Sequence, residues 1–177
     1  MSAAGETMDI VMPNNNEDAF AAMAENLGTK QLLFLYSLES FKSSKNSAIL
    51  CTPKQLKEAK KKTQFVFVKA EADVRKIVEQ KPYAVFGLEY IENKDSLHYR
   101  RSGIDQVLAK IMADNDVAYA FSFADLMNSP SYMQPIILGR MYQNLMLAKK
   151  YKVKVILASF ASEPMQMRSE KDLNCLS

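Results

Sequence analysis

Short apolar runs alternate along this chain with longer stretches whose apolar residues recur at helical spacing. Runs of strand length are predicted at 8–12, 31–38, 47–51, 65–68, 83–88, 117–123 and 153–159. Helices are predicted between most of them, over 16–27, from 52, over 70–80, around 104–111, over 131–151 and from 169. Because parallel strands need crossover connections, which are usually helices, the alternation predicts an α/β protein with a parallel sheet covered by helices. The pattern fits both an open doubly wound sheet and a barrel.

Two helix boundaries carry clear sequence signals. Gly28 follows the helix predicted over 16–27 and suits the left-handed conformation that ends many helices. Thr52 and Gln55 have the spacing of a capping box, and Pro53 falls at the first helical position, where its missing N–H costs nothing. We therefore predict that one helix ends at Gly28 and that another begins just after Thr52.

The chain has 177 residues, which at roughly 150 residues per domain predicts a single domain over 1–177. Its two cysteines, Cys51 and Cys175, lie far apart and form no C-x-x-C motif, and the residues after Met1 lack the basic and apolar regions of a signal peptide. The apolar runs are far shorter than the roughly 20 residues that span a bilayer. We expect a cytoplasmic protein with no membrane partner.

Candidate catalytic groups are few in this sequence. The single histidine, His98, excludes a metal site built from several imidazoles. Glu89 and Asp125 follow predicted strands and could form an acid–base pair, although acids in such positions more often cap helices or pair with arginine. The sequence contains no Gly-rich phosphate-loop motif and no serine-nucleophile motif. We therefore predict no catalytic residue, no metal and no cofactor.

Basic residues are concentrated locally although the net charge is only +3. Residues 29–69 contain nine lysines against two acids, whereas residues 1–28 contain five acids and no base. Arg100 and Arg101 directly precede a helix start predicted at Ser102–Gly103, and the free N–H groups of a helix start suit a phosphate. A structural alternative is that the two arginines form salt bridges with Glu89 or Asp95.

Four further bases, Lys149, Lys150, Lys152 and Lys154, cluster where the long predicted helix meets the last predicted strand. Alternation along that strand would place Lys152 and Lys154 on the same side. Lys149 and Lys150 could instead serve only to complement the negative end of the helix dipole. Separated cationic groups of this kind fit an extended polyanion better than a compact substrate.

Four blocks in the second half of the sequence resemble ribonuclease P protein component 3, a subunit of the archaeal and eukaryotic enzyme. They are DSLHYRRSGIDQVLAK at 95–110, NDVAYAFSFADL at 115–126, RMYQNLMLAKKYKVKVILAS at 140–159, and Pro164 with MRSEKDL at 167–173. The blocks follow the order and spacing of the family over about residues 84–176. The first 80 residues agree mainly in the order of elements and in the start at Asp9-Ile10-Val11.

The resemblance implies a TIM-type parallel barrel of about seven strands, related to the PHP phosphoesterases and incomplete at its C-terminal end. Those enzymes carry a His-x-His pair after the first strand, whereas here Asp9 is followed by Ile10, Val11 and Met12, so their metal chemistry is not expected. The implied role is that of a non-catalytic subunit, inactive alone, that supports a catalytic RNA in removing the 5′ leader from precursor tRNA. The implied partners are this RNA, ribonuclease P component 2 in a heterodimer or heterotetramer, and precursor tRNA indirectly.

From the motifs and the charge together we predict that nine basic residues contact RNA. Arg140 lies within about a third of a helical turn of Lys149 and Lys150, whereas Arg168 would lie at the opposite end of the last strand from Lys152. Two alternative functions stay open: a free-standing PHP-like metal-dependent phosphoesterase that uses Asp9, Glu89 and Asp125, and a protein adaptor without RNA contact. The nine predicted RNA-contacting residues are Arg100, Arg101, Lys110, Arg140, Lys149, Lys150, Lys152, Lys154 and Arg168.

Overall fold

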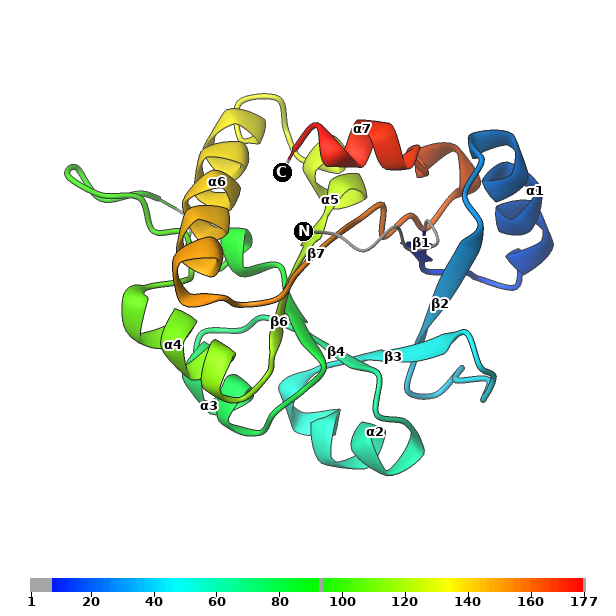
Figure 1. The fold of residues 1–177 in the computed structure, drawn as a ribbon, viewed down its shortest axis with the longest axis horizontal. Helices are drawn as coiled ribbons and strands as arrows, with labels where there is room; N and C mark the ends of the chain where they lie inside the picture. Colours follow the sequence, from blue (N-terminus) through cyan, green and yellow to red (C-terminus); the bar gives the residue numbers. More distant parts are fainter. Residues whose placement is uncertain (1–7, 93, 177) are drawn as a thin grey trace.

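The computed structural model describes residues 8–92 and 94–176, which form one parallel sheet surrounded by helices (Figure 1). The strands of this part of the chain lie side by side in the order of the sequence, and every neighbouring pair is parallel. The prediction of a parallel α/β sheet of about seven strands is therefore confirmed. The strands are β1 (Met8–Val11), β2 (Gln31–Ser37), β3 (Ser47–Cys51), β4 (Val66–Lys69), β5 (Ala84–Phe86), β6 (Ala118–Ser122) and β7 (Val155–Ala158).

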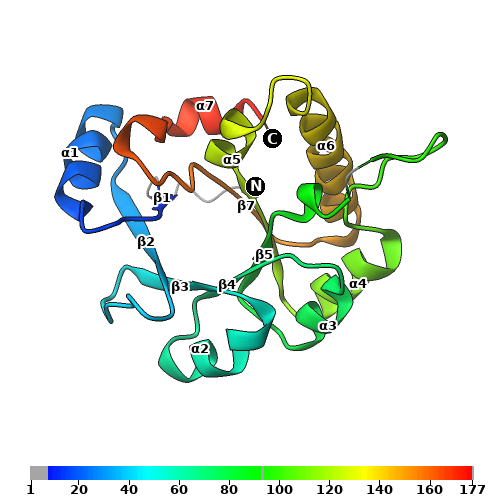
Figure 2. The ribbon, with the colours of Figure 1, turned by 180° about the vertical axis from the view of Figure 1, so that it is seen from behind.

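Helices on the outside of the sheet connect these strands, except that a loop over 38–46 joins β2 to β3 (Figures 1 and 2). Gly28 ends the first of them in the left-handed conformation, with φ +71°, as predicted. The helices are α1 (Glu17–Leu27), α2 (Leu56–Lys62), α3 (Val74–Glu79), α4 (Gln106–Asp114), α5 (Phe123–Asn128), α6 (Gln134–Tyr151) and α7 (Glu170–Asn174), with short 3₁₀ turns η1 (Pro53–Gln55), η2 (Leu88–Tyr90) and η3 (Pro164–Gln166).

The sheet curls into a nearly closed barrel, which decides between the two architectures that the sequence left open (Figure 2). The seam between β1 and β7 is joined just beyond the strand ends, where Val11 forms a parallel bridge with Ala161 and the Met12 N–H donates to the Ala161 carbonyl at 2.7 Å. The Asp9 carboxylate adds a contact across the seam, because it accepts the Ser159 N–H at 2.7 Å. One buried apolar cluster combines residues from both edges and the middle of the sheet: Ile10, Leu35, Ala48, Phe67, Ala84, Phe86, Ala118, Ala120, Ala158 and Phe160.

Two boundaries differ from the predictions in a way that affects the candidate site. The helix expected at Ser102–Gly103 begins at Gln106, because the Asp105 side chain accepts the Leu108 N–H at 2.7 Å and caps it there. The last strand begins at Val155, because Lys152 adopts the left-handed conformation, with φ 58°, that ends α6. Lys152 and Lys154 thus precede β7, and strand alternation gives no basis for placing them on one side.

The apolar run predicted as a strand over 117–123 ends one residue earlier. The Ser122 hydroxyl accepts the Asp125 N–H at 3.1 Å and starts α5, a helix that the sequence pattern did not reveal. Within the described residues no helix is long and apolar enough to span a bilayer.

Candidate nucleic-acid interface

The segment after β5 is held against α6 by a buried arginine. The Arg140 side chain has no exposed surface, and its Nη1 atom donates to the carbonyls of Glu89 and Glu92, each at 2.7 Å. Its Nε and Nη2 atoms both lie 2.8 Å from Oδ1 of Asp95. The guanidinium thus binds the backbone carbonyls of Glu89 and Glu92 and the side chain of Asp95. The prediction that Arg140 contacts RNA is therefore wrong for this fold, because a phosphate has no access to a fully buried group.

A second set of buried polar contacts continues from this arginine along α6. The Asn144 amide donates to the Ser102 carbonyl at 2.8 Å and to the Glu89 carboxylate at 3.1 Å, and the Tyr119 hydroxyl donates to the same Glu89 oxygen. Glu89 is 1% exposed, and this burial raises its pKa to about 7. The carboxylate therefore acts as a structural acceptor between η2, β6 and α6, where no substrate can reach it.

The raised pKa of Glu89 predicts a specific loss of stability as the pH rises. The folded protein holds this proton more tightly than the unfolded chain does, so the free energy of unfolding should fall between about pH 4.5 and pH 7. Glu89→Gln is neutral at every pH and should lack this loss. Urea titrations at several pH values should therefore show the variant gaining up to about 3 kcal/mol relative to the parent across this range. Parallel stability profiles for the two proteins would contradict the assignment.

The acid–base pair that Glu89 and Asp125 could have formed is not assembled in this structure. Asp125 instead lines a separate cleft of about 440 Å³ with Lys69 and Tyr90 at the carboxyl ends of the strands. Asp9 is buried at the barrel seam, and this burial raises its pKa. Over residues 8–92 and 94–176 no three His, Cys, Asp or Glu side chains lie close enough together to hold a metal ion. The three carboxylates of the phosphoesterase alternative thus occupy different environments.

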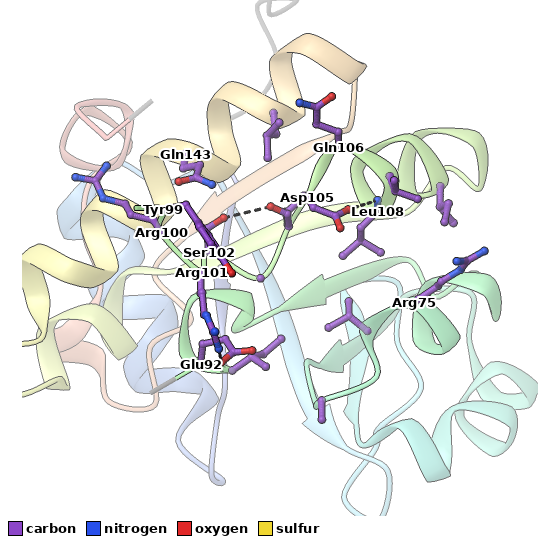
Figure 3. A pocket seen from close by; sticks show the side chains of 18 of the residues that line it. Arg75, Glu92, Tyr99, Arg100, Arg101, Ser102, Asp105, Gln106, Leu108 and Gln143 are labelled. Carbon is purple, nitrogen blue, oxygen red and sulfur yellow. Dashed lines mark hydrogen bonds and ion pairs between the residues drawn. The ribbon is translucent and has the colours of Figure 1, made fainter. Parts of the chain in front are cut away.

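Arg100 and Arg101 line an open cleft of about 880 Å³ between α3, residues 91–92 and 99–105, α4 and α6 (Figure 3). Arg101 forms an ion pair with Glu92 at 3.1 Å in which both side chains are more than 40% exposed. Arg100 has a long contact of 3.5 Å to the Gly139 carbonyl. The arginines thus remain accessible to a phosphate. Tyr99 beside the arginines lines the same cleft, as do polar side chains from three further elements, Arg75 of α3, Gln106 of α4 and Gln143 of α6.

The helix start beside these arginines is not a free phosphate site. The Asp105 carboxylate already occupies the N-terminus of α4, and a negative group there competes with a phosphate. Among the described residues neither arginine forms the salt bridge to Glu89 or Asp95 that the structural alternative named: Arg101 pairs with Glu92 instead, and only its backbone N–H donates to Asp95, at 2.9 Å. Sequence analysis did not identify Gln106 or Gln143 as cleft residues, because an isolated glutamine carries no positional signal. The capping position of Asp105, directly before a periodic apolar run, was a usable signal for the helix start.

The remaining predicted bases are distributed over α4, the end of α6, the residues just before β7 and the segment after β7. Lys149 and Lys150 are exposed in the last turn of α6, and Lys150 lies 5.3 Å from the Tyr151 ring centre. Lys154 pairs with Asp116 at 2.8 Å on an open surface, where such pairs contribute little to stability. Arg168 follows β7, at the other end of the strand from Lys152 and Lys154, donates to the carbonyls of Met165 and Met167, and lies over the Phe123 ring. The exposed Lys110 lies on α4.

The fold and this site define a class of protein: a parallel α/β barrel whose carboxylates are engaged in structural contacts and whose exposed arginines and lysines border a cleft and a helix end. No protein-family model matches the chain. Among curated proteins, it is 36% identical over 72 residues to ribonuclease P protein component 3 of Methanococcus maripaludis strain C7, which covers 41% of this chain and 31% of that protein. It is 28% identical over 123 residues to the protein of the same name from strain C6, covering 68% of this chain and 50% of that protein. The chain is therefore similar in sequence to curated proteins named ribonuclease P protein component 3.

The match to these curated relatives spans about a third to a half of their length. A third relative of the same name, from Methanosarcina barkeri strain Fusaro, is 39% identical over 70 residues, covering 40% of this chain and 29% of that protein. In structure, the chain resembles a chain in the cryo-EM structure of archaeal ribonuclease P with mature tRNA, with a TM-score of 0.71 and 22% identity over 95% of this chain and 80% of that one. This likeness supports the fold.

Proposed function

We propose that the chain is a non-catalytic protein subunit of ribonuclease P that binds and stabilises the catalytic RNA for removal of the 5′ leader from precursor tRNA. The observation that carries this proposal is the similarity to curated proteins named ribonuclease P protein component 3. The site agrees with a non-catalytic role, since Glu89 and Asp9 are buried in structural hydrogen bonds. The proposed partners are the ribonuclease P RNA, the protein component 2 and, through the RNA, precursor tRNA.

Reconstitution tests this function most directly. The full chain, added to ribonuclease P RNA and component 2, should raise the rate of 5′-leader cleavage, while the chain alone should cleave neither precursor tRNA nor a phosphoester with Mn²⁺. Phosphoesterase activity of the isolated chain would favour the PHP-like alternative. Failure to bind RNA at low salt would favour the adaptor without RNA contact.

The cleft arginines should contribute to RNA affinity through phosphate contacts. Replacing Arg100 and Arg101 together with Ala should weaken binding at all RNA sequences and lower the slope of log K against log salt by about one unit per lost contact. RNA binding measured from low to moderate salt gives this slope. As a control of equal charge, Lys57→Ala with Lys61→Ala on the exposed surface of α2 should leave it nearly unchanged. An equal fall in slope for both double variants would show only a general charge effect.

The lysines at the end of α6 give a second, independent prediction. Changing Lys149, Lys150, Lys152 and Lys154 to Gln should reduce the salt slope if they contact phosphates. If Lys149 and Lys150 only complement the helix dipole, the same variant should lose about 1 kcal/mol of stability and keep its slope. Thermal unfolding and salt-dependent binding on one preparation separate the two roles.

A further inference from the structure

Helices α4 and α6 each contribute a pair of side chains to the cleft of about 880 Å³ that Arg100 and Arg101 line, which we call the arginine cleft. Val107 and Ile111 lie four residues apart on α4, so they share one face of that helix. Gln143 and Leu147 have the same spacing on α6. Val107 is 60% exposed, and Ile111 and Leu147 are half-buried. The three apolar side chains give the cleft an accessible apolar floor, which phosphate groups alone would not use.

The charges around this floor also differ from those of a surface that binds only a phosphate backbone. Three arginines and three carboxylates line the cleft, so their formal charges cancel. Phosphates gain from nearby cations and are repelled by nearby carboxylates. A nucleobase has apolar faces and an edge with both donors and acceptors, so a mixed polar rim around an apolar floor suits it better. The charged residues of the cleft are Asp73, Arg75, Glu92, Arg100, Arg101 and Asp105.

Gln143 places a free amide beside the apolar floor. Its side chain is half-buried in the cleft, and within residues 8–92 and 94–176 it has no hydrogen-bond partner (Figure 3). Both its N–H donors and its carbonyl acceptor are therefore available to a ligand. A glutamine amide can donate to and accept from one base edge at the same time, as in its paired contact with adenine. The amide thus has the chemistry to bind the polar edge of a base that lies on the floor.

Tyr99 and the two arginines after it supply the other parts of a nucleotide site. Tyr99 is 61% exposed, and an aromatic ring provides a face on which an unpaired base can stack. Arg100 and Arg101 are exposed at the same cleft and can contact the phosphates on either side of that base. A base inside a duplex is stacked between its neighbours, so it cannot enter a cleft without leaving the helix.

We infer that the arginine cleft binds a single unpaired RNA nucleotide, with its base on the floor between α4 and α6 and its flanking phosphates on Arg100 and Arg101. The Gln143 amide binds the edge of the base, and Tyr99 stacks on its open face. This inference rests on the proposed function, since it names the part of an RNA that this site takes. The protein should therefore prefer an RNA with an unpaired nucleotide to a fully paired RNA.

Three RNA hairpins with one stem sequence test this preference with the full chain. The first contains a single bulged adenosine, the second has an abasic ribose at the same place, and the third is fully paired. The first two have the same number of phosphates, so a difference between them reports the base alone. In fluorescence anisotropy at one salt concentration, the bulged hairpin should bind about tenfold more tightly than either of the others.

Two variants and one matched control locate the preference in the cleft. Gln143→Leu removes the amide without changing the charge, and Tyr99→Ala removes the stacking face, so each should reduce the preference for the bulged over the abasic hairpin several-fold. The salt slope should stay that of the parent in both, because no cation is lost. Gln64→Leu makes the same change as Gln143→Leu at an exposed glutamine between α2 and β4, and it should keep the preference. Thermal unfolding checks that each variant is folded.

Other outcomes would overturn the inference. Equal binding of the bulged and abasic hairpins by the parent would leave the cleft as a site for phosphates alone. A preference that persists in both Gln143→Leu and Tyr99→Ala, or that is lost equally in Gln64→Leu, would reject the cleft as the site of the base. If the parent binds ribonuclease P RNA and raises leader cleavage without preferring the bulged hairpin, this inference fails and the proposed function stands. If the parent binds neither that RNA nor any hairpin, the proposed function fails as well.

Discussion

Replacement of Arg140 with Met should destabilise the protein by about 3–5 kcal/mol, because the variant leaves several buried polar groups without partners. The guanidinium has no exposed surface and satisfies the carbonyls of Glu89 and Glu92 as well as the Asp95 carboxylate. Met preserves much of the side-chain volume but has no hydrogen-bond donor. Each buried carbonyl that loses its partner therefore lowers the stability of the folded state, because it has neither water nor a donor to bind. Urea denaturation followed by circular dichroism measures this loss.

A surface arginine provides the matched control for this prediction. Arg75 pairs with Glu79 at 3.0 Å, and both side chains are more than half exposed. Arg75→Met should therefore change the stability by less than about 1 kcal/mol. If Arg140→Met cost no more than Arg75→Met, the buried contacts of Arg140 would have no energetic role. The stability loss should also be accompanied by weaker RNA binding, since Asp95, which Arg140 holds, accepts the backbone N–H of Arg101.

The strands and most helices could be predicted from the sequence, because in these elements the turn and capping residues and the pattern of buried apolar residues indicate the same structure. The third strand was predicted over 47–51 and is observed over Ser47–Cys51, since a run of apolar residues between turn residues has few alternatives. The end of α1 at Gly28 was predicted for a similar reason, because glycine tolerates the left-handed conformation that the position requires. The spacing of apolar residues could not predict that the sheet closes into a barrel, because the bridge that joins its edges, between Val11 and Ala161, connects residues 150 positions apart.

The roles of individual bases were less accessible than the fold. Arg140 has the same charge and helical context as a surface arginine, and only its distant partners, Asp95 and the carbonyls after β5, explain its burial. The sequence nevertheless contained a weak indication that Arg140 is buried. Ile137 and Asn144 lie three positions before it and four after it, on the same face of the helix, and both are buried, as is the adjacent Met141. Lys152 was predicted to lie on the same side as Lys154 because apolar residues alternate around it. Nothing in the sequence marks a lysine that ends a helix with positive φ.

The chain beyond Arg101 is fixed by a glycine whose replacement should be as costly as that of Arg140. Gly103 has φ +84°, and a Cβ atom there would lie 2.3 Å from the Leu88 carbonyl oxygen. In Gly103→Ala the positive φ should therefore cost about 1–2 kcal/mol of stability. The added methyl group must also displace the backbone near Ser102, whose carbonyl accepts a hydrogen bond from Asn144. We expect a total loss of about 3 kcal/mol or more, measured by chemical denaturation.

Gly28→Ala separates the strain of the backbone from the clash. Gly28 has a similar φ of +71°, but a Cβ atom there meets nothing within 4 Å, so this variant should lose only the cost of the conformation, about 1–2 kcal/mol. The two glycines also differ in what their replacement should do to binding. Because Gly103 lies two residues after Arg101 and lines the same cleft, its variant should shift both arginines and reduce RNA affinity, whereas Gly28→Ala should retain it. Equal losses of stability in the two variants would mean that the backbone at Leu88 moves away from the added methyl group at little cost. The packing of η2 against residues 102–104 would then not position the arginines.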